Sequence, residues 1–172
     1  MFGLVKFTDA CNMACRYCCM GDMVHSTTMS LTSAHRVVET ILAYYSTLSC
    51  SEKDICFHGG EPSILGADYL NSLWRQIRQN DPTITISMQS NMYSISEDLI
   101  NVAKENKVKI STSLDGPKGI HNISRIDHAG NGTFDRILAN LQRCKDAGIS
   151  LGVICTLNSY NWDKSKELYS FA

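Results

Sequence analysis

The residues that decide the fold are 2–19, with the sequence FGLVKFTDACNMACRYCC. Residues 2–8 are mostly aliphatic, aromatic or β-branched, which is typical of a β-strand. The residues after them place Cys11, Cys15 and Cys18 in the spacing C-x3-C-x2-C, with Cys19 directly following. Half of the eight cysteines in the chain therefore lie in one short segment. Such a cluster after a strand indicates a metal site rather than a disulfide framework, whose cysteines are spread along the chain.

The rest of the chain repeats the order of strand and helix. Further strands are expected at residues 54–58, 83–89, 108–113 and 150–156, and helices at residues 33–48, 67–79, 96–105, 133–147 and from 161 onward. This alternation predicts βαβ units and a parallel sheet, of either the doubly wound or the barrel type. In both types functional residues lie in the loops that follow the strands, so the cysteines fall at the functional edge.

The composition limits the class of protein. The 172 residues, 44% of them hydrophobic, suffice for one domain with its own core. A formal net charge of −1 argues against a nucleic-acid partner. No apolar run approaches the roughly 20 residues that span a bilayer, and the first residues lack the pattern of a signal peptide. We therefore expect a cytoplasmic protein without a membrane partner.

The cysteine spacing narrows the kind of metal site. Thiolates favour zinc, copper(I) or iron–sulfur clusters. Structural zinc takes four ligands from paired motifs, yet Cys19 is too close to Cys18 to share a metal with it, and no second cysteine pair follows. Three protein ligands leave one coordination position open, as in a catalytic metal site. On the spacing alone, zinc binding and three unrelated thiols stay open as alternatives.

The second and third strands end in further polar motifs. The second strand is followed by Gly59, Gly60, Glu61 and Pro62. The glycines allow a ligand to approach the backbone closely, the proline stiffens the turn, and the glutamate can accept a hydrogen bond from an ammonium group. The third strand ends in Gln-Ser90-Asn91-Met, which suits either a site or a helix-entry turn.

The fourth strand ends in Ser113-Leu-Asp115-Gly-Pro, and Arg125 follows soon after. The planar guanidinium of Arg125 can hold a carboxylate with two hydrogen bonds. Its alternative is a surface ion pair with Asp127. For Asp115, turn chemistry is the favoured interpretation because Asp-Gly-Pro is a strong turn sequence.

Taken together, these motifs resemble those of the radical S-adenosylmethionine (SAM) enzymes, which carry C-x3-C-x2-C after the first strand and Gly-Gly-Glu-Pro after the second. By that resemblance, Cys11, Cys15 and Cys18 ligate a [4Fe–4S] cluster whose open iron binds the amino and carboxylate groups of SAM. An electron from the cluster then cleaves SAM to a 5′-deoxyadenosyl radical that abstracts a substrate hydrogen. In this family the Gly-Gly-Glu-Pro motif hydrogen-bonds the SAM amino group.

A finer resemblance is to anaerobic sulfatase-maturating enzymes and related SPASM-type peptide modifiers. It rests on the Ser-Leu-Asp-Gly-Pro motif at 113–117, on His121 and Arg125, and on Gly-Asn-Gly-Thr-Phe at 130–134. In those relatives the strand serine and the downstream arginine help to hold SAM. The resemblance therefore assigns this role to Ser113 and Arg125.

The same resemblance also covers Tyr17, the stretch from Ser90 to Met92, and Cys19. Tyr17 stands where the family commonly has an aromatic residue whose backbone meets the adenine. Ser90 and Asn91 match the family's Gln-Ser/Thr-Asn-Gly stretch, with Met92 in place of the usual glycine. Cys19 replaces a common aromatic residue and is expected not to be a ligand.

The fold that the resemblance implies is α/β, a partial TIM-like (β/α)6 radical SAM barrel of which about five βα units are present. Residues 1–172 would form a core domain that is incomplete at its C-terminus, without the sixth strand or an auxiliary-cluster domain. The acid or base that acts on the substrate would then lie outside this chain, and the activity of these residues alone is left open. The open sheet edge after residues 150–156 is an expected site of self-association.

The first functional hypothesis is a radical SAM enzyme of the oxidoreductase type that abstracts hydrogen from a peptide or protein side chain. Its partners would be that substrate and a low-potential electron donor such as flavodoxin or ferredoxin. One alternative is a non-enzymatic or degenerate iron–sulfur or zinc-binding module. Another keeps the radical chemistry but acts on a small-molecule cofactor precursor.

Overall fold

The computed structural model describes residues 1–20 and 26–171. Its strands are β1 (Phe2–Lys6), β2 (Asp54–His58), β3 (Thr85–Gln89), β4 (Lys109–Ser113) and β5 (Leu151–Ile154). Its α-helices are α1 (Leu31–Ser46), α2 (Ala67–Asn80), α3 (Glu97–Glu105), α4 (Lys118–Ser124), α5 (Phe134–Asp146) and α6 (Ser165–Phe171). Two short 3-10 helices are η1 (Pro62–Leu65) and η2 (Trp162–Lys164). His25, for which the sequence predicts a solvent-facing position, lies outside the described residues.

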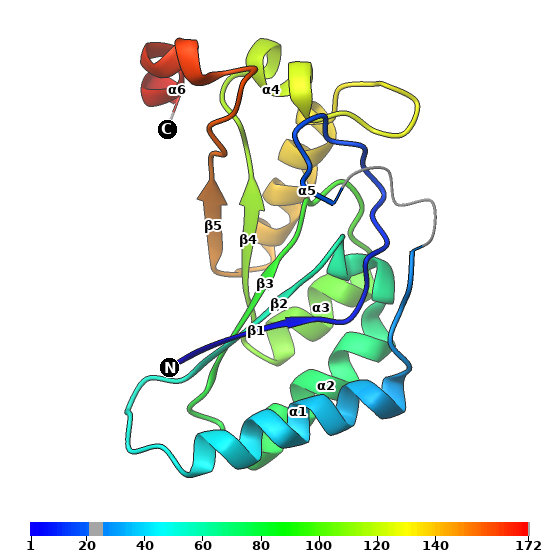
Figure 1. Cartoon of the computed structure of the whole chain (residues 1–172), viewed down its shortest axis with the longest axis vertical. Helices are drawn as coiled ribbons and strands as arrows, with labels where there is room; N and C mark the ends of the chain where they lie inside the picture. Colours follow the sequence, from blue (N-terminus) through cyan, green and yellow to red (C-terminus); the bar gives the residue numbers. More distant parts are fainter. Residues whose placement is uncertain (21–25, 172) are drawn as a thin grey trace.

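The strands form a single parallel sheet in the order β1-β2-β3-β4-β5, so each strand pairs with its neighbours along the chain (Figure 1). The register aligns Ile55 of β2 with Ile86 of β3, and Ile110 of β4 with Leu151 of β5. Helices α1, α2, α3 and α5 lie along one face of the sheet (Figure 1). The expected α/β architecture, five parallel strands in an open sheet with helices between them, is confirmed. None of the described helices is both long and apolar enough to cross a membrane.

The core lies between the sheet and these helices. In β2, Ile55 and Phe57 are buried, whereas His58 is exposed. Because successive side chains of a strand point to opposite faces, the apolar set packs under the helices. Trp74 of α2 is fully buried and its ring meets that of Phe57 edge-on, with 5.9 Å between the centroids. On β2, β3 and β4 the opposite face carries mostly polar residues, whereas on β1 it exposes Phe2 and Leu4.

Helix α4 has no counterpart among the helices expected from the sequence. It begins directly after Pro117, which stands at its N-cap position, and it has only seven residues. So short a helix shows no apolar stripe of two or more turns, which is the signal used to predict the others. Its importance lies in what it positions, because Arg125 follows it immediately.

The edge strand β5 differs from expectation at one cysteine. Cys144 lies on the apolar face of its helix in the sequence, which predicts a core position, and it is buried on α5. Cys155 lies within a run of β-forming residues, which also predicts a core position, but this is wrong because it is exposed just beyond β5. Val153 and Ile154 are exposed beside it. Among the described strands β5 has no neighbour on its outer side, so self-association through this edge stays a prediction.

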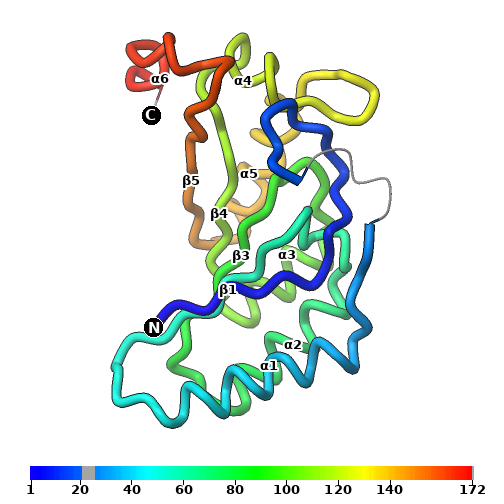
Figure 2. The backbone as a smooth tube through the Cα atoms, in the orientation of Figure 1, coloured from blue at the N-terminus to red at the C-terminus, as the bar shows by residue number. Residues whose placement is uncertain are grey.

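The loop after β1 lies beside the segment that joins α4 to α5, beyond the carboxyl ends of the strands (Figure 2). The backbone amide of Ala14 donates to the carbonyl of Ile126 at 2.9 Å, and the amide of Arg16 donates to the carbonyl of Ser124 at 2.8 Å. These bonds pair a loop near the start of the chain with a segment far along it. They give the cysteine loop a fixed backbone path although it contains no regular element of its own.

Candidate functional site

The cysteine loop opens into a cavity of about 760 Å³. Its lining includes Cys11, Cys15, Cys18, Gly59 and Gly60. Cys11 and Cys15 are partly buried and Cys18 is exposed. The structure therefore brings together the three predicted metal ligands and the glycines of the second strand end. The volume falls within the range of about 300–1,000 Å³ typical of small-molecule sites.

The three thiols influence one another electrostatically. Burial raises the pKa of Cys15 to about 11, the Arg125 charge opposes this, and Cys11 and Cys18 add to the rise. The pKa of Cys11 is also raised, mainly by burial. Thiols in this state are protonated at neutral pH, so a metal that binds them must release protons.

The arrangement of these thiols fits a cluster better than a single ion. Among the described residues, no three His, Cys, Asp or Glu side chains converge as the ligands of one metal ion would. A zinc–sulfur bond of about 2.3 Å places thiolates within roughly 4 Å of each other. In a [4Fe–4S] cluster each thiolate binds a different iron, so three ligands spread around a cavity suit it.

The glycine motif is packed directly against the cysteine loop. The amide of Gly60 donates to the carbonyl of Thr8 at 2.9 Å, and the amide of Glu61 donates to the carbonyl of Ala10 at 2.7 Å. A Cβ atom on Gly60 would overlap the carbonyl oxygens of both Ala10 and Asp9. Only glycine therefore allows the two loops to approach this closely.

The Glu61 side chain has a different role from the one expected. It is 1% exposed, and its carboxylate accepts hydrogen bonds from the Ser63 amide at 3.0 Å, the Ser90 hydroxyl at 2.7 Å and the Asn91 amide at 2.5 Å. Burial raises its pKa, while these hydrogen bonds oppose the rise. The carboxylate thus links the second strand end to the third, and Glu61 is not among the residues that line the cavity. Within the part of the chain that the structure describes, no group donates to the carbonyl oxygens of Gly59 and Gly60, which stay available to an ammonium group.

Asn91 connects the hydrogen-bonded Glu61 carboxylate to the cysteine loop. Its side-chain amide nitrogen donates to the Asn12 side-chain oxygen at 2.8 Å and lies 3.6 Å from the Cys11 sulfur. Its side-chain oxygen accepts from the Tyr93 amide at 2.9 Å, which fixes the orientation of the amide. Met92 follows with a φ of 57°, the left-handed region that glycine adopts most easily, so the unusual methionine keeps the glycine-like turn.

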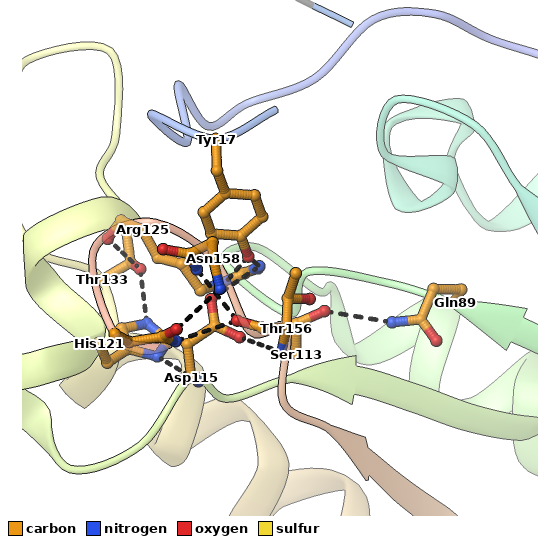
Figure 3. Close-up of polar contacts among 10 residues, drawn as sticks. Tyr17, Gln89, Ser113, Asp115, His121, Arg125, Thr133, Thr156 and Asn158 are labelled. Atoms are coloured by element: carbon orange, nitrogen blue, oxygen red, sulfur yellow. Dashed lines mark hydrogen bonds and ion pairs between the residues drawn. The ribbon is translucent and has the colours of Figure 1, made fainter. Parts of the chain in front are cut away.

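Arg125 is buried and lies beneath the cysteine loop (Figure 3). One terminal nitrogen donates to the Tyr17 hydroxyl at 2.8 Å and lies 3.9 Å from the Asp115 carboxylate. Its Nε is buried and has no hydrogen-bond partner within residues 1–20 and 26–171. Burial alone would lower its pKa, but Cys15, Tyr17 and Asp115 raise it above the ordinary value. A surface ion pair with Asp127, the alternative interpretation, is therefore wrong.

Asp115 is not the turn residue that the sequence indicated. It is fully buried, and its carboxylate accepts from the Tyr17 hydroxyl at 2.6 Å and from the Thr156 amide at 2.9 Å. Its own amide donates to the His121 ring at 3.2 Å. Ser113 lies nearby, 3.5 Å from the Gln89 side-chain nitrogen (Figure 3). Sequence reasoning missed the roles of Asp115 and Thr156, and only the clustering of Asp, His and Arg after one strand could have suggested the first.

His121 makes stability depend on pH. Burial, aided by the Arg125 charge, lowers its pKa to about 4. An unfolded histidine titrates near 6.5, so as the pH falls below that value the unfolded state gains a proton that the folded state does not bind, and stability decreases. We expect a loss of about 3 kcal/mol between pH 7 and 4 from this group. Urea unfolding of wild type and His121→Asn measures it, with exposed His58→Asn as the control. A pH dependence that is unchanged in His121→Asn would contradict the assignment.

In a comparison with protein-family models, residues 5–172 match the Radical SAM superfamily. The chain belongs to the radical SAM superfamily. The match covers nearly the whole chain, including the cysteine loop and all later strands. Members of this superfamily use a [4Fe–4S] cluster and SAM.

Among curated proteins, the chain is 25% identical over 169 residues to a cysteine-type anaerobic sulfatase-maturating enzyme of Clostridium perfringens. That alignment covers 95% of this chain and 46% of the clostridial enzyme. The radical SAM chain therefore spans about half the length of this curated relative.

Solved structures agree with this similarity. A hexahistidine-tagged form of anSMEcpe with bound AdoMet superposes with a TM-score of 0.85 at 25% identity, over 99% of this chain and 47% of that one. Native anSMEcpe with bound AdoMet and the Kp18Cys peptide gives a TM-score of 0.84 at 26% identity, over 99% and 47%. The radical SAM fold is thus shown by both the family match and the superposition.

Proposed function

We propose that this protein is a radical SAM enzyme that acts on a peptide or protein side chain. The observation that carries the proposal is that Cys11, Cys15 and Cys18 line the same cavity as Gly59 and Gly60. When bound, the cluster and SAM supply a one-electron cleavage that yields a 5′-deoxyadenosyl radical able to abstract a hydrogen atom.

Each part of the site has a task in this proposal. The three cysteines hold the cluster and leave one iron free of protein ligands. The carbonyl oxygens of Gly59 and Gly60 accept from the SAM ammonium group, and Arg125 binds the SAM carboxylate with its free donors. Pro62 begins η1 and stiffens the turn that presents the glycines.

The remaining predicted contacts support this arrangement. Ser90 and Asn91 hold the Glu61 carboxylate by hydrogen bonds, and in this proposal they support the glycine loop rather than contact SAM directly. Ser113 lies at the end of β4, in the same group of polar residues as Arg125 (Figure 3), and would hold SAM together with it. For Tyr17, a backbone contact with the adenine stays part of the proposal.

The cofactor assignment is tested by anaerobic reconstitution of the chain. We expect about four iron and four sulfide per chain, and dithionite-dependent formation of 5′-deoxyadenosine from SAM. Zinc without sulfide would contradict the proposal in favour of a zinc module. A cluster that does not cleave SAM would contradict it in favour of a degenerate module.

The substrate class is supported by the sulfatase-maturating relatives, one of which is solved with a bound peptide. It is tested with peptides that carry a central cysteine or serine deuterated at its β-carbon. We expect deuterium to appear in 5′-deoxyadenosine when the peptide is present, with an undeuterated peptide as the control. SAM cleavage without any transfer of label would favour a small-molecule substrate. Exposed Cys18 leaves the site reachable for the proposed electron donor, a flavodoxin or ferredoxin.

A further inference from the structure

We infer that Tyr17 and Asp115 are positioning residues that fix the Arg125 guanidinium for the carboxylate of SAM. The inference rests on the proposed function and assigns to the side chains of these two residues the role of orienting Arg125, separate from the proposed contact of the Tyr17 backbone with the adenine. Tyr17 lies between the second and third cysteines, so its hydroxyl would join the cluster-bearing loop to the group that holds SAM.

The direction of every bond at the Tyr17 hydroxyl is determined by its partners. Arg125 can only donate, and the Asp115 carboxylate can only accept. The hydroxyl therefore accepts from Arg125 at 2.8 Å and donates to Asp115 at 2.6 Å (Figure 3). One terminal nitrogen of Arg125 is thereby held by the Tyr17 hydroxyl, whose donor and acceptor directions are both fixed by its partners.

A second chain of bonds fixes the backbone of Arg125. The His121 Nδ1 accepts from the Asp115 amide at 3.2 Å, so the ring proton lies on Nε2. That nitrogen then donates to the Thr133 hydroxyl at 3.1 Å, and the hydroxyl donates to the Arg125 carbonyl at 2.9 Å. Both ends of the arginine are held by groups that converge on Asp115.

These bonds do not involve the Nε of Arg125. Among the described residues that buried nitrogen has no hydrogen-bond partner, and the residue as a whole is 5% exposed. An unpaired donor on a buried charge is costly, and an anion that binds it relieves that cost. Because Tyr17 and Asp115 occupy the other side of the guanidinium, the incoming carboxylate meets a guanidinium that is already oriented.

The test compares two cofactors in reconstituted protein, SAM and decarboxylated SAM, which keeps the amine but lacks the carboxylate. We expect Tyr17→Phe to weaken SAM binding about tenfold, as is usual when a partner that orients a binding group is removed. Binding of decarboxylated SAM is expected to change less than about twofold. Iron and sulfide contents stay at the wild-type level, because the hydroxyl does not touch the cysteines.

Tyr69→Phe is the matched control, since the Tyr69 hydroxyl also donates within the fold, to the Met29 carbonyl at 2.9 Å, away from Arg125. It should leave both affinities unchanged. Asp115→Asn is expected to reproduce the selective loss for SAM. In an Arg125→Ala background, Tyr17→Phe should have no further effect on SAM affinity.

Equal losses for the two cofactors in Tyr17→Phe would overturn the inference, because they indicate a general structural defect. An unchanged preference for SAM over decarboxylated SAM would overturn it as well. These results can be distinguished from failure of the proposed function, in which the wild-type protein itself would not prefer SAM over decarboxylated SAM. A wild-type protein without that preference would overturn both the inference and the proposed function.

Discussion

The Cys15→Ala variant is expected to lose its cluster and, with it, all reductive cleavage of SAM. Removing a partner of a metal ligand commonly costs 10–100-fold in metal affinity or activity, so loss of a ligand itself should cost about a hundredfold or more. The measurement is iron and sulfide content after anaerobic reconstitution, together with dithionite-driven formation of 5′-deoxyadenosine. Cys11→Ala and Cys18→Ala should behave in the same way.

The chain supplies its own control for this experiment. Cys19 is adjacent to Cys18 and exposed, yet it is not among the residues that line the cavity. Cys19→Ala should therefore keep full iron content and cleavage. If Cys19→Ala loses the cluster while Cys15→Ala retains it, the ligand assignment is wrong.

The second large effect is expected at Gly60. In Gly60→Ala the added Cβ would overlap two backbone carbonyl oxygens of the cysteine loop, and backbone cannot move aside as a side chain can. Overpacking of this kind costs about 1–3 kcal/mol of stability. Since the displaced segment leads directly into Cys11, we also expect cluster content and SAM cleavage to fall at least about tenfold. Urea unfolding and iron analysis measure the two effects separately.

Gly119→Ala is the matched control because a Cβ there meets nothing within 4 Å. Gly119 lies in α4, where alanine is favoured over glycine by about 1 kcal/mol, so this variant should be slightly more stable than wild type. Wild-type activity in Gly60→Ala would show that the two loops do not need this close approach.

The parts of the fold that the sequence predicts best are those with strong periodicity. The stripe of Leu70, Leu73, Trp74 and Ile77 marked α2, and all four residues are buried in its helix. β5 was predicted through residue 156 but ends at Ile154, because an edge strand with one covered face has fewer contacts to extend it. The short α4 escaped prediction because its position depends on tertiary contacts of His121 and Ser124 rather than on a local pattern.

In the candidate site, too, features set by local sequence could be predicted and features set by tertiary contacts could not. The cysteine spacing and the glycine pair could be predicted because each reflects a local chemical need, ligand number in one case and close backbone approach in the other. The orientation of the Glu61 carboxylate could not be predicted, since it depends on hydrogen bonds from Ser90 and Asn91 at the end of the next strand. Asp115 was assigned to a turn for the same reason, because its partners Tyr17 and Thr156 are distant in sequence.

The pairing of the Ala14 and Arg16 amides with Ser124 and Ile126 has a consequence for synthesis of the chain. At about 5–20 residues per second, a ribosome needs on the order of 5–20 s to make the residues between these partners. The sheet can grow strand by strand in that interval, since each strand pairs with the one before it. The backbone of the cysteine loop cannot make these hydrogen bonds until the later segment has been synthesised, so we expect the cluster to be inserted after that point.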